Sequence, residues 1–355
     1  WVPKGVVVSR GSVIAYASWF VAHAGLTLAD SILAHAPAHF DVSLVPVCGA
    51  ALSGAAIVVV ARAADSNVRA IYTLARERGL THWFSTPYLL TLFSRSRDFA
   101  SMELPALRDV YFAGEVIPNQ TVRRWMEQLP RARLHNAYGP TEATITCALH
   151  TYREAPRLDD PPPLGKPHAH CALSIAGEGG GLVRRPGEIG EILISGQGVA
   201  LGYLNDPALT IERFLELDGG GGRAYRSGDL GWFDEGGTFF FSGRADEQVK
   251  IRGFRVEPGE VERTLRAHPA VAEAHVVAVQ HGSDGEIVLV AFVTEAQRSP
   301  PVSEPALRGH VAASLPRYMV PHRVLQVAEL PTTGSGKVDR AALRASAEHA
   351  LAGSR

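Results

Sequence analysis

The chain of 355 residues has almost no excess charge and few cysteines, and both shortages exclude classes of protein. Its 35 Lys and Arg residues nearly balance its 36 Asp and Glu residues, which leaves a formal net charge of -1. Nucleic-acid-binding domains usually carry a basic surplus, so we expect no nucleic-acid partner. The three cysteines, Cys48, Cys147 and Cys171, are too few and too scattered for a disulfide scaffold. They indicate a reducing cytoplasm as the compartment.

Long apolar runs and clustered metal ligands are also scarce. One uncharged stretch, Val42 to Ala61, is about long enough to span a bilayer. It contains Pro46 and ends in β-branched residues, so we predict a buried helix that runs into a buried parallel strand, and no membrane partner. His168 and His170 are close in sequence but have no second ligand cluster at a suitable spacing. They predict a loop that leads into a strand, with no metal site.

Helical patterns alternate with short apolar runs through the first 150 residues. The predicted helices span residues 68–78 and 119–128, and the predicted strands span residues 81–84, 110–113 and 133–136. This alternation indicates an α/β fold with a mostly parallel sheet. Ligands bind such sheets where strands end and turns begin, as at residues 136–142.

The composition of the sequence and the pattern of its predicted elements change twice further along the chain. From about Pro161, Gly- and Pro-rich loops with short strands at 191–195 and 238–242 indicate a β-rich subdomain. Near Asp246 a second unit begins, in which Pro258 opens a helix and two strands follow it. We therefore predict a large α/β domain over residues 1–245 and a small α+β lobe over residues 246–355.

The most informative segment is the turn that contains Gly139 and Pro140. Proline fixes its own φ and glycine tolerates unusual angles, so the pair predicts a tight bend. Tyr138 precedes the bend, and Thr141 and Glu142 follow it. A flat ring, a hydroxyl and a carboxylate suit a nucleotide base, a phosphate and Mg²⁺. A plain surface turn is the alternative for this segment alone.

Four further segments form a set of motifs together with this turn. They lie at residues 225–230, 243–253, 315–321 and 334–340. With them, the chain resembles the adenylate-forming superfamily, and in particular the amino-acid-activating enzymes that load carrier proteins. The resemblance implies that ATP and Mg²⁺ are the cofactors and that an amino acid is joined to AMP. The aminoacyl group would then pass to the phosphopantetheine thiol of a carrier protein. Residues 1–5 resemble the end of the family's phosphate-binding loop, so we expect an N-terminally incomplete family member.

The resemblance assigns roles to individual residues. Lys337 would be the catalytic cation that bridges the carboxylate and the α-phosphate, assisted by Thr141 and by Glu142, which would also hold Mg²⁺. A Walker A loop is excluded because Val338 stands where Ser or Thr is needed, while a solvated surface lysine stays an alternative. The predicted nucleotide-binding residues are Lys4, Gly114, Glu115, Asn136, Ala137, Tyr138, Gly139, Asp229 and Arg244. Asp246 would be the hinge of the small lobe, with an exposed loop aspartate as the alternative.

The substrate end of the site is more specific. Asp41 matches the family aspartate that pairs with the substrate's α-ammonium, and a carboxylate beside apolar residues is costly without a cation. An α-amino acid is therefore favoured. The predicted side-chain pocket consists of Val42, Val45, Phe84, Tyr111, Ala113, Ala137, Ile145 and Thr146. The bulk of Phe84 and Tyr111 suggests a small or modest substrate side chain.

Residues 83–87, 112–119 and 129–133 look like the D-alanine–carrier-protein ligases, a freestanding subfamily. Ala113 stands where those ligases usually have cysteine, which puts D-alanine in doubt. A freestanding ligase and an adenylation domain of a peptide synthetase fit equally well. An acyl-CoA or aryl-acid ligase of the same superfamily, and a non-catalytic nucleotide-binding remnant, are the alternatives.

Overall fold

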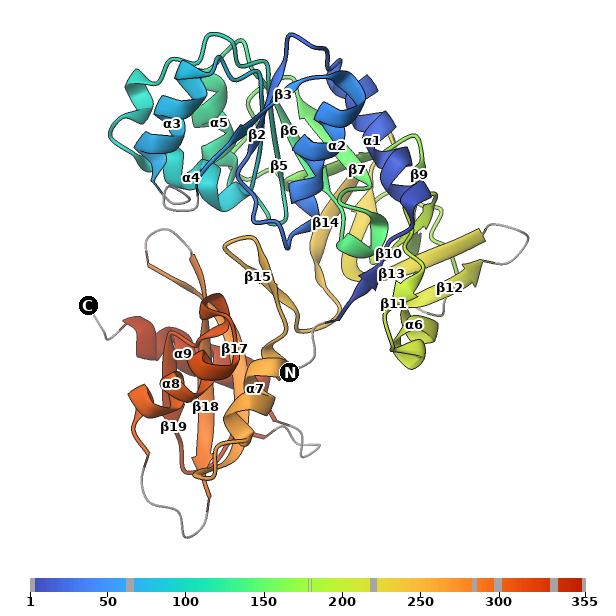
Figure 1. Cartoon of the computed structure of the whole chain (residues 1–355). Helices are drawn as coiled ribbons and strands as arrows, with labels where there is room; N and C mark the ends of the chain where they lie inside the picture. Colours follow the sequence, from blue (N-terminus) through green and yellow to red (C-terminus); the bar gives the residue numbers. More distant parts are fainter. Residues whose placement is uncertain are drawn as a thin grey trace. The chain divides into compact units, whose positions relative to one another are not determined.

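The structure is a computed structural model, and it describes residues 4–61, 67–177, 179, 181–217, 222–282, 286–296, 302–332 and 338–352. The chain divides into two compact units, the first spanning Lys4–Asp246 and the second running from Glu247 onward. Both units contain helices and strands (Figure 1). Each is described by itself below.

A parallel sheet forms the first part of the larger unit. Its strands, in spatial order, are β3 (Ala56–Val59), β2 (Ser31–Ala34), β4 (His82–Ser85), β5 (Asp109–Ala113) and β6 (Arg133–Tyr138). Helices α3 (Val68–Glu77), α4 (Pro87–Arg95) and α5 (Asn119–Gln128) cover one face, and α1 (Arg10–Ala24) and α2 (Leu44–Ser53) cover the other (Figure 1). The helix starts are encoded locally, since Ser9, Asn67 and Thr86 cap α1, α3 and α4 through their side-chain oxygens.

The same sheet continues through antiparallel strands into the β-rich part of the unit. These are β7 (Ala148–Tyr152), β8 (Pro163–Pro167), β14 (Phe239–Arg244), β13 (Gly222–Phe233), β10 (Gly190–Gly196) and β9 (Cys171–Ala176), with β12 (Phe214–Leu217) paired to β13. A separate short pair joins β1 (Val6–Val7) to β11 (Gly202–Tyr203), and α6 (Pro207–Arg213) follows. Short 3₁₀ turns lie at η1 (Asp41–Ser43), η3 (Phe99–Ser101) and η4 (Thr141–Ala143).

Two hydrophobic cores pack against the two faces of the parallel sheet. One contains Trp83 and Phe112 of the strands and Trp125 of α5. The other contains Tyr111 of β5 and Phe20 of α1. Because successive side chains of a strand point to opposite faces, neighbouring residues such as Tyr111 and Phe112 belong to different cores.

The smaller unit is an α+β structure. Its sheet joins β17 (Val271–His281), β18 (Glu286–Glu295) and β19 (Arg323–Gln326), and β15 (Val249–Ile251) pairs with β16 (Phe254–Val256). Helices α7 (Pro258–Arg266) and α8 (Glu304–Ser314) share one core with the sheet, and α9 (Arg340–Ala352) shares the other. A 3₁₀ turn, η6 (Arg317–Met319), lies between α8 and β19.

The predicted α/β fold with a small C-terminal α+β lobe is confirmed. The stretch 42–61 forms α2 followed by a parallel strand, β3, as predicted, but the expected burial of both is wrong, since α2 buries only Val45, Pro46 and Gly49. β3 is the outer strand of the sheet, and Ile57 and Val59 are 39% and 68% exposed. Within the described ranges, no helix is long and apolar enough to cross a membrane. His168 and His170 precede β9, as the predicted loop does.

Candidate active site

The carboxyl ends of β5 and β6 bring most of the predicted pocket together. Phe84 is paired with Tyr111 across β4 and β5, and Ala113 with Ala137 across β5 and β6, all on the face that α1 and α2 cover. One apolar cluster contains six of the eight predicted pocket residues: Val45, Phe84, Tyr111, Ala113, Ala137 and Ile145. Val42 packs against the same cluster. The eighth, Thr146, is buried, and its hydroxyl hydrogen-bonds to the His168 Nε2 atom at 3.0 Å.

The turn after β6 is tightly closed and strained. The Cys147 N–H donates to the Tyr138 carbonyl at 2.7 Å, and a Cβ on Gly139 would lie only 2.5 Å from the Thr146 Cα atom, so this position needs glycine. Thr144 and Ile145 have φ angles of 60° and 72°, which β-branched residues avoid. Such residues cost about 1–3 kcal/mol each and tend to occur at functional sites.

Asp41 is a carboxylate without its full set of partners. It begins η1, and its Oδ2 atom is buried and has no hydrogen-bond partner. Burial raises the pKa of Asp41, while the Thr141 side chain and the Val42 and Ile145 N–H groups lower it by less. Asp41 therefore lies beside the strained turn as a costly buried acid, which a cation would stabilise.

Glu142 is held by a tyrosine that sequence reasoning missed. The carboxylate is 1% exposed, and its Oε1 atom accepts a hydrogen bond of 2.7 Å from the Tyr203 hydroxyl. Burial and the neighbouring Glu142 charge raise the pKa of Tyr203, so this hydroxyl stays neutral and donates. Nothing in the Gly202–Tyr203 dipeptide signals the contact, because it depends on the packing of the preceding segment against the turn, where the Ala200 N–H donates to the Glu142 carbonyl at 2.8 Å.

Lys4 comes directly before this strand pair. The Gly5 carbonyl accepts from the Leu204 N–H at 2.7 Å, and β1 lies against η4, the turn that contains Thr141 and Glu142. The structure thus brings the segment that begins at Lys4 to the same edge of the unit as the turn.

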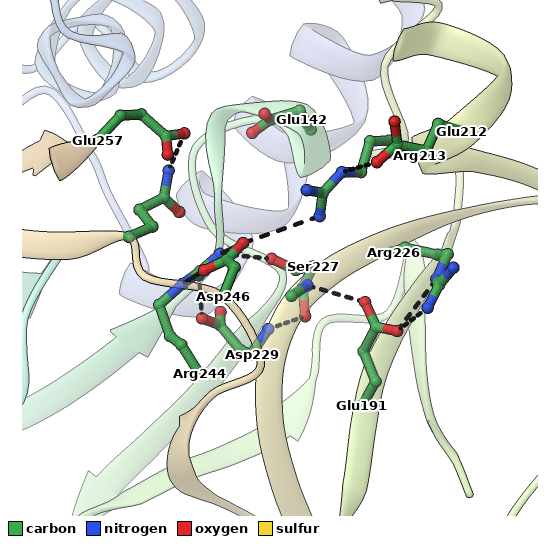
Figure 2. A network of polar contacts seen from close by, with 12 residues as sticks. Glu142, Glu191, Glu212, Arg213, Arg226, Ser227, Asp229, Arg244, Asp246 and Glu257 are labelled. Atoms are coloured by element: carbon green, nitrogen blue, oxygen red, sulfur yellow. Dashed lines mark hydrogen bonds and ion pairs between the residues drawn. The ribbon is translucent and has the colours of Figure 1, made fainter. Parts of the chain in front are cut away.

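An ionic network links the other predicted nucleotide residues (Figure 2). Asp229 is 4% exposed and accepts from the Tyr138 hydroxyl at 2.7 Å and from the Arg244 guanidinium. Arg244 also donates to both oxygens of Asp246, at 2.6 and 2.9 Å. The register of β13 and β14 places Asp229 opposite Arg244, so the pairing follows from the sheet itself.

Residues around Asp229 fix its position. The Ser227 hydroxyl donates to the Ile192 carbonyl at 2.7 Å and accepts from the Asp229 N–H at 3.0 Å. The Gly228 N–H donates to Glu191 at 3.0 Å, and a Cβ at Gly228 would lie 2.7 Å from the Arg244 Nη2 atom. Sequence reasoning missed Ser227 and Glu191, although Ser227 adjoins the Gly-Asp step already singled out.

The remaining predicted nucleotide-binding residues lie at the ends of β5 and β6. Gly114 has a φ of 108°, which glycine alone adopts easily, and Glu115 follows it beyond the end of β5. The Asn136 side chain donates to the Pro163 carbonyl at 2.7 Å and so joins β6 to β8. The Tyr138 ring is buried, and the predicted stacking of a base on it stays a prediction.

Lys337 lies outside the described residues. Thr332 and Val338, on either side of the undescribed residues 333–337, form an antiparallel bridge. Within the part of the chain that is described, no group of three His, Cys, Asp or Glu side chains could hold a metal ion. Magnesium in nucleotide sites needs only one or two carboxylates besides the phosphates, so a single carboxylate is enough, and the role of Glu142 as the ligand stays a prediction.

Comparisons with known proteins show the family of the chain. Residues 2–204 match the family described as AMP-binding enzyme, and residues 260–337 match the AMP-binding enzyme C-terminal domain. A D-alanine–D-alanyl carrier protein ligase of Bacillus cereus is 31% identical over 341 residues, which are 95% of this chain and 67% of that protein. The chain thus spans about two thirds of the length of this relative.

Solved structures give the same result. The Vibrio cholerae adenylation domain AlmE, in complex with glycyl-adenosine-5'-phosphate, is 28% identical with a TM-score of 0.84, covering 98% of this chain and 64% of AlmE. An NRPS protein that contains adenylation and PCP domains is 31% identical with a TM-score of 0.76, covering 90% of this chain and 53% of that one. Sequence and structure together show that this chain belongs to the family of AMP-binding enzymes.

Proposed function

We propose that this chain activates an α-amino acid with ATP, forming an aminoacyl adenylate and pyrophosphate, and transfers the aminoacyl group to a carrier-protein thiol. The observation that carries the proposal is the buried, unpartnered Oδ2 atom of Asp41 beside the turn after β6. A plain carboxylic acid would leave this charge uncompensated, whereas the α-ammonium of an amino acid would pair with it.

The nucleotide would lie at the turn after β6. Asp229 is the acceptor for the ribose hydroxyls, because a carboxylate has about four acceptor sites and Tyr138 and Arg244 use two of them. Arg244 adds positive charge for the phosphates. Magnesium bound at Glu142 would neutralise phosphate charge, and Thr141 offers a hydroxyl at the same bend.

Two mutually repelling anions, the substrate carboxylate and the α-phosphate, must approach one another in this reaction. A cation placed between them lowers the barrier because it interacts most strongly when charge develops. Lys337 is proposed for this role from its motif. Asp246, joined to Arg244 at the end of the larger unit, is proposed as the hinge that lets a second arrangement present the phosphopantetheine arm.

A carrier protein is proposed as the partner because two similar proteins are named with one. The ligase of Bacillus cereus is named for a D-alanyl carrier protein, and the NRPS protein contains a PCP domain. Because Ala113 replaces the cysteine usual in the D-alanine ligases, D-alanine itself is not proposed. A cytoplasmic location is proposed with this function.

The test is ATP–pyrophosphate exchange by the protein that contains this chain, with panels of amino acids, aryl acids and fatty acids. We expect exchange with at least one amino acid and none with the matching des-amino acid. Exchange with aryl or fatty acids alone would make the protein an acyl-CoA or aryl-acid ligase. Nucleotide binding without any exchange would make it a non-catalytic member of the family.

A further inference from the structure

A short segment that ends at Tyr203 is bound to the turn that contains Glu142 at three places. The Gly198 carbonyl accepts a hydrogen bond from the Thr144 hydroxyl at 2.6 Å. The Ala200 N–H donates to the Glu142 carbonyl at 2.8 Å. The Tyr203 hydroxyl donates to the Glu142 Oε1 atom at 2.7 Å. The segment therefore holds both the main chain of Glu142 and its carboxylate.

Tyr203 is itself held in place. Its N–H donates to the Thr210 hydroxyl at 2.9 Å, and its own hydroxyl lies 3.3 Å from that of Tyr225. A Cβ on Gly202 would lie 2.6 Å from the Thr210 side chain, so the close approach of β11 to α6 needs glycine. Tyr203 and Glu142 are only 7% and 1% exposed. The Tyr203 hydroxyl thus has a fixed, buried position from which it orients the Glu142 carboxylate.

The chemistry of this contact suits a carboxylate that binds a metal ion. Mg²⁺ prefers oxygen ligands, and a carboxylate has about four acceptor positions, so the hydrogen bond from Tyr203 is compatible with a metal ion on Glu142. Burial raises the pKa of Tyr203, so its hydroxyl is a neutral donor, which orients a carboxylate without cancelling its charge. Carboxylates that bind metals are commonly hydrogen-bonded in this way, and loss of the partner typically lowers metal affinity about 10–100-fold.

We propose that Tyr203 is a positioning residue that orients the Glu142 carboxylate to bind the magnesium ion of the nucleotide. This inference rests on the proposed activation with ATP, in which Glu142 is the predicted metal ligand. Tyr203 touches neither substrate in this proposal and acts only through Glu142.

A purely structural role for Tyr203 is the alternative, because its ring packs in an apolar cluster with Phe214 and Tyr225. The two roles differ in how the effect of a variant depends on metal. A residue that acts through the metal ligand affects nucleotide binding only when metal is present. A residue that only packs affects binding equally with and without metal.

The test measures how much Mg²⁺ tightens nucleotide binding by the protein that contains this chain. The probe is α,β-methylene-ATP, whose α–β bridge cannot be cleaved. Calorimetry gives its Kd once with Mg²⁺ and once with EDTA, and the ratio of the two Kd values is the metal effect. We expect the unmodified protein to bind the probe more tightly with Mg²⁺.

Tyr203→Phe removes the hydroxyl and keeps the ring. It should weaken binding with Mg²⁺ about tenfold or more and leave the Kd in EDTA unchanged. Glu142→Gln should lower the metal effect at least as much. In the Glu142→Gln background Tyr203→Phe should change nothing further, because two residues that act through one contact are not additive. Titration with Mn²⁺, followed by electron paramagnetic resonance, should show the same loss of affinity for the metal itself.

Tyr72→Phe is the matched control, because it also removes a hydrogen-bonded hydroxyl. The Tyr72 hydroxyl accepts from the Glu103 N–H at 3.1 Å, and the ring packs against the core on the face of the parallel sheet that α3 covers. This variant should leave both Kd values unchanged.

The outcomes separate this inference from the proposed function. Equal weakening with Mg²⁺ and with EDTA in Tyr203→Phe, or an additive effect in the Glu142→Gln background, overturns the inference and leaves amino-acid activation standing. A protein that exchanges an amino acid but whose nucleotide binding Mg²⁺ does not tighten has the same consequence. Absence of exchange with every amino acid overturns the proposed function, and the metal effect on nucleotide binding still decides the role of Tyr203.

Discussion

Two aspartates at opposite ends of the parallel strands show how burial can serve structure or function. Asp109 begins β5, at the amino end of the strands, and Asp41 lies beside the turn at their carboxyl end. Burial would raise the pKa of Asp109, but His135, His82 and Arg133 together hold it well below its ordinary value. For Asp41 burial dominates, and its pKa is raised.

The hydrogen-bond partners account for the difference. Asp109 is 0% exposed, and its oxygens contact the His135 ring at 2.8 Å and the Arg133 guanidinium at 2.7 and 2.9 Å. The Oδ2 atom of Asp41 has no partner. A buried carboxylate whose hydrogen bonds and counter-charges come from the fold itself stabilises the fold. A buried carboxylate that lacks such partners can instead bind a cationic ligand.

Asp41 and Lys337 are proposed to act on different charged groups of the substrates, so their variants should differ most. If Asp41 takes the substrate's ammonium, Lys337 is left to act on the carboxylate and the phosphate. Lys337→Ala should therefore lower kcat about 10²–10³-fold, since one electrostatic contact in the transition state is lost. The KM for the amino acid and the Kd for ATP should change little. Equal losses in binding and in kcat, measured by exchange kinetics and calorimetry, would contradict this role.

Asp41→Asn should separate function from stability. We expect kcat/KM for the amino acid to fall about 10²-fold or more, because the α-ammonium loses its counter-charge. The melting temperature without substrate should rise at neutral pH, because the amide removes a buried, incompletely partnered charge. A lower melting temperature would mean that the fold itself depends on the Asp41 charge.

Asp109→Asn should have the opposite result. Loss of the partnered charge should lower the free energy of unfolding by about 3 kcal/mol, while the folded fraction keeps its exchange activity. The depressed pKa of Asp109 also contributes stability that is present above the ordinary carboxyl pKa and lost as the pH falls below it. Denaturant titrations at pH 7 and pH 3 should thus show a smaller acid-induced loss in the variant. Unchanged stability at pH 7 would contradict the comparison.

The smallest expected effect is on the pH dependence of amino-acid binding. Because the pKa of Asp41 is raised in the free protein, the carboxyl keeps its proton to a higher pH than an ordinary aspartate. Its ionised form binds the ammonium, so affinity should rise with pH, by up to about tenfold per unit below this pKa, and then level off. Calorimetric titration with the exchange-active amino acid measures the effect. The Asp41→Asn variant should show no such slope.

Local sequence predicted much of the fold because its signals act over short range. Pro258 begins α7 as predicted, and the helix predicted over residues 68–78 is α3. The alternation of apolar runs predicted the parallel strands. The burial of β3 was wrong, because position in the sheet, not composition, decides whether an apolar strand lies at the edge.

The candidate site was predicted through motifs, and its missing members are those that motifs do not contain. Tyr203 contacts Glu142 because the segment before it packs against the turn, where the Ala200 N–H donates to the Glu142 carbonyl. Glu191 contacts Gly228 because β10 pairs with β13. Such contacts join residues that are far apart in sequence, so no local pattern reports them.

The sequence by itself determined the family, several of the helices and strands, and the acids, hydroxyls and lysines available for chemistry. The tertiary structure alone decided which of these groups form hydrogen bonds or ion pairs with one another and which have polar atoms left without a partner. Asp41 and Asp109 are the same residue type with the same intrinsic pKa, and only the neighbours that the fold supplies make one a structural anion and the other a proposed binding group. The physical reason is that the free energy of a buried charge depends on its partners, and long-range folding places those partners.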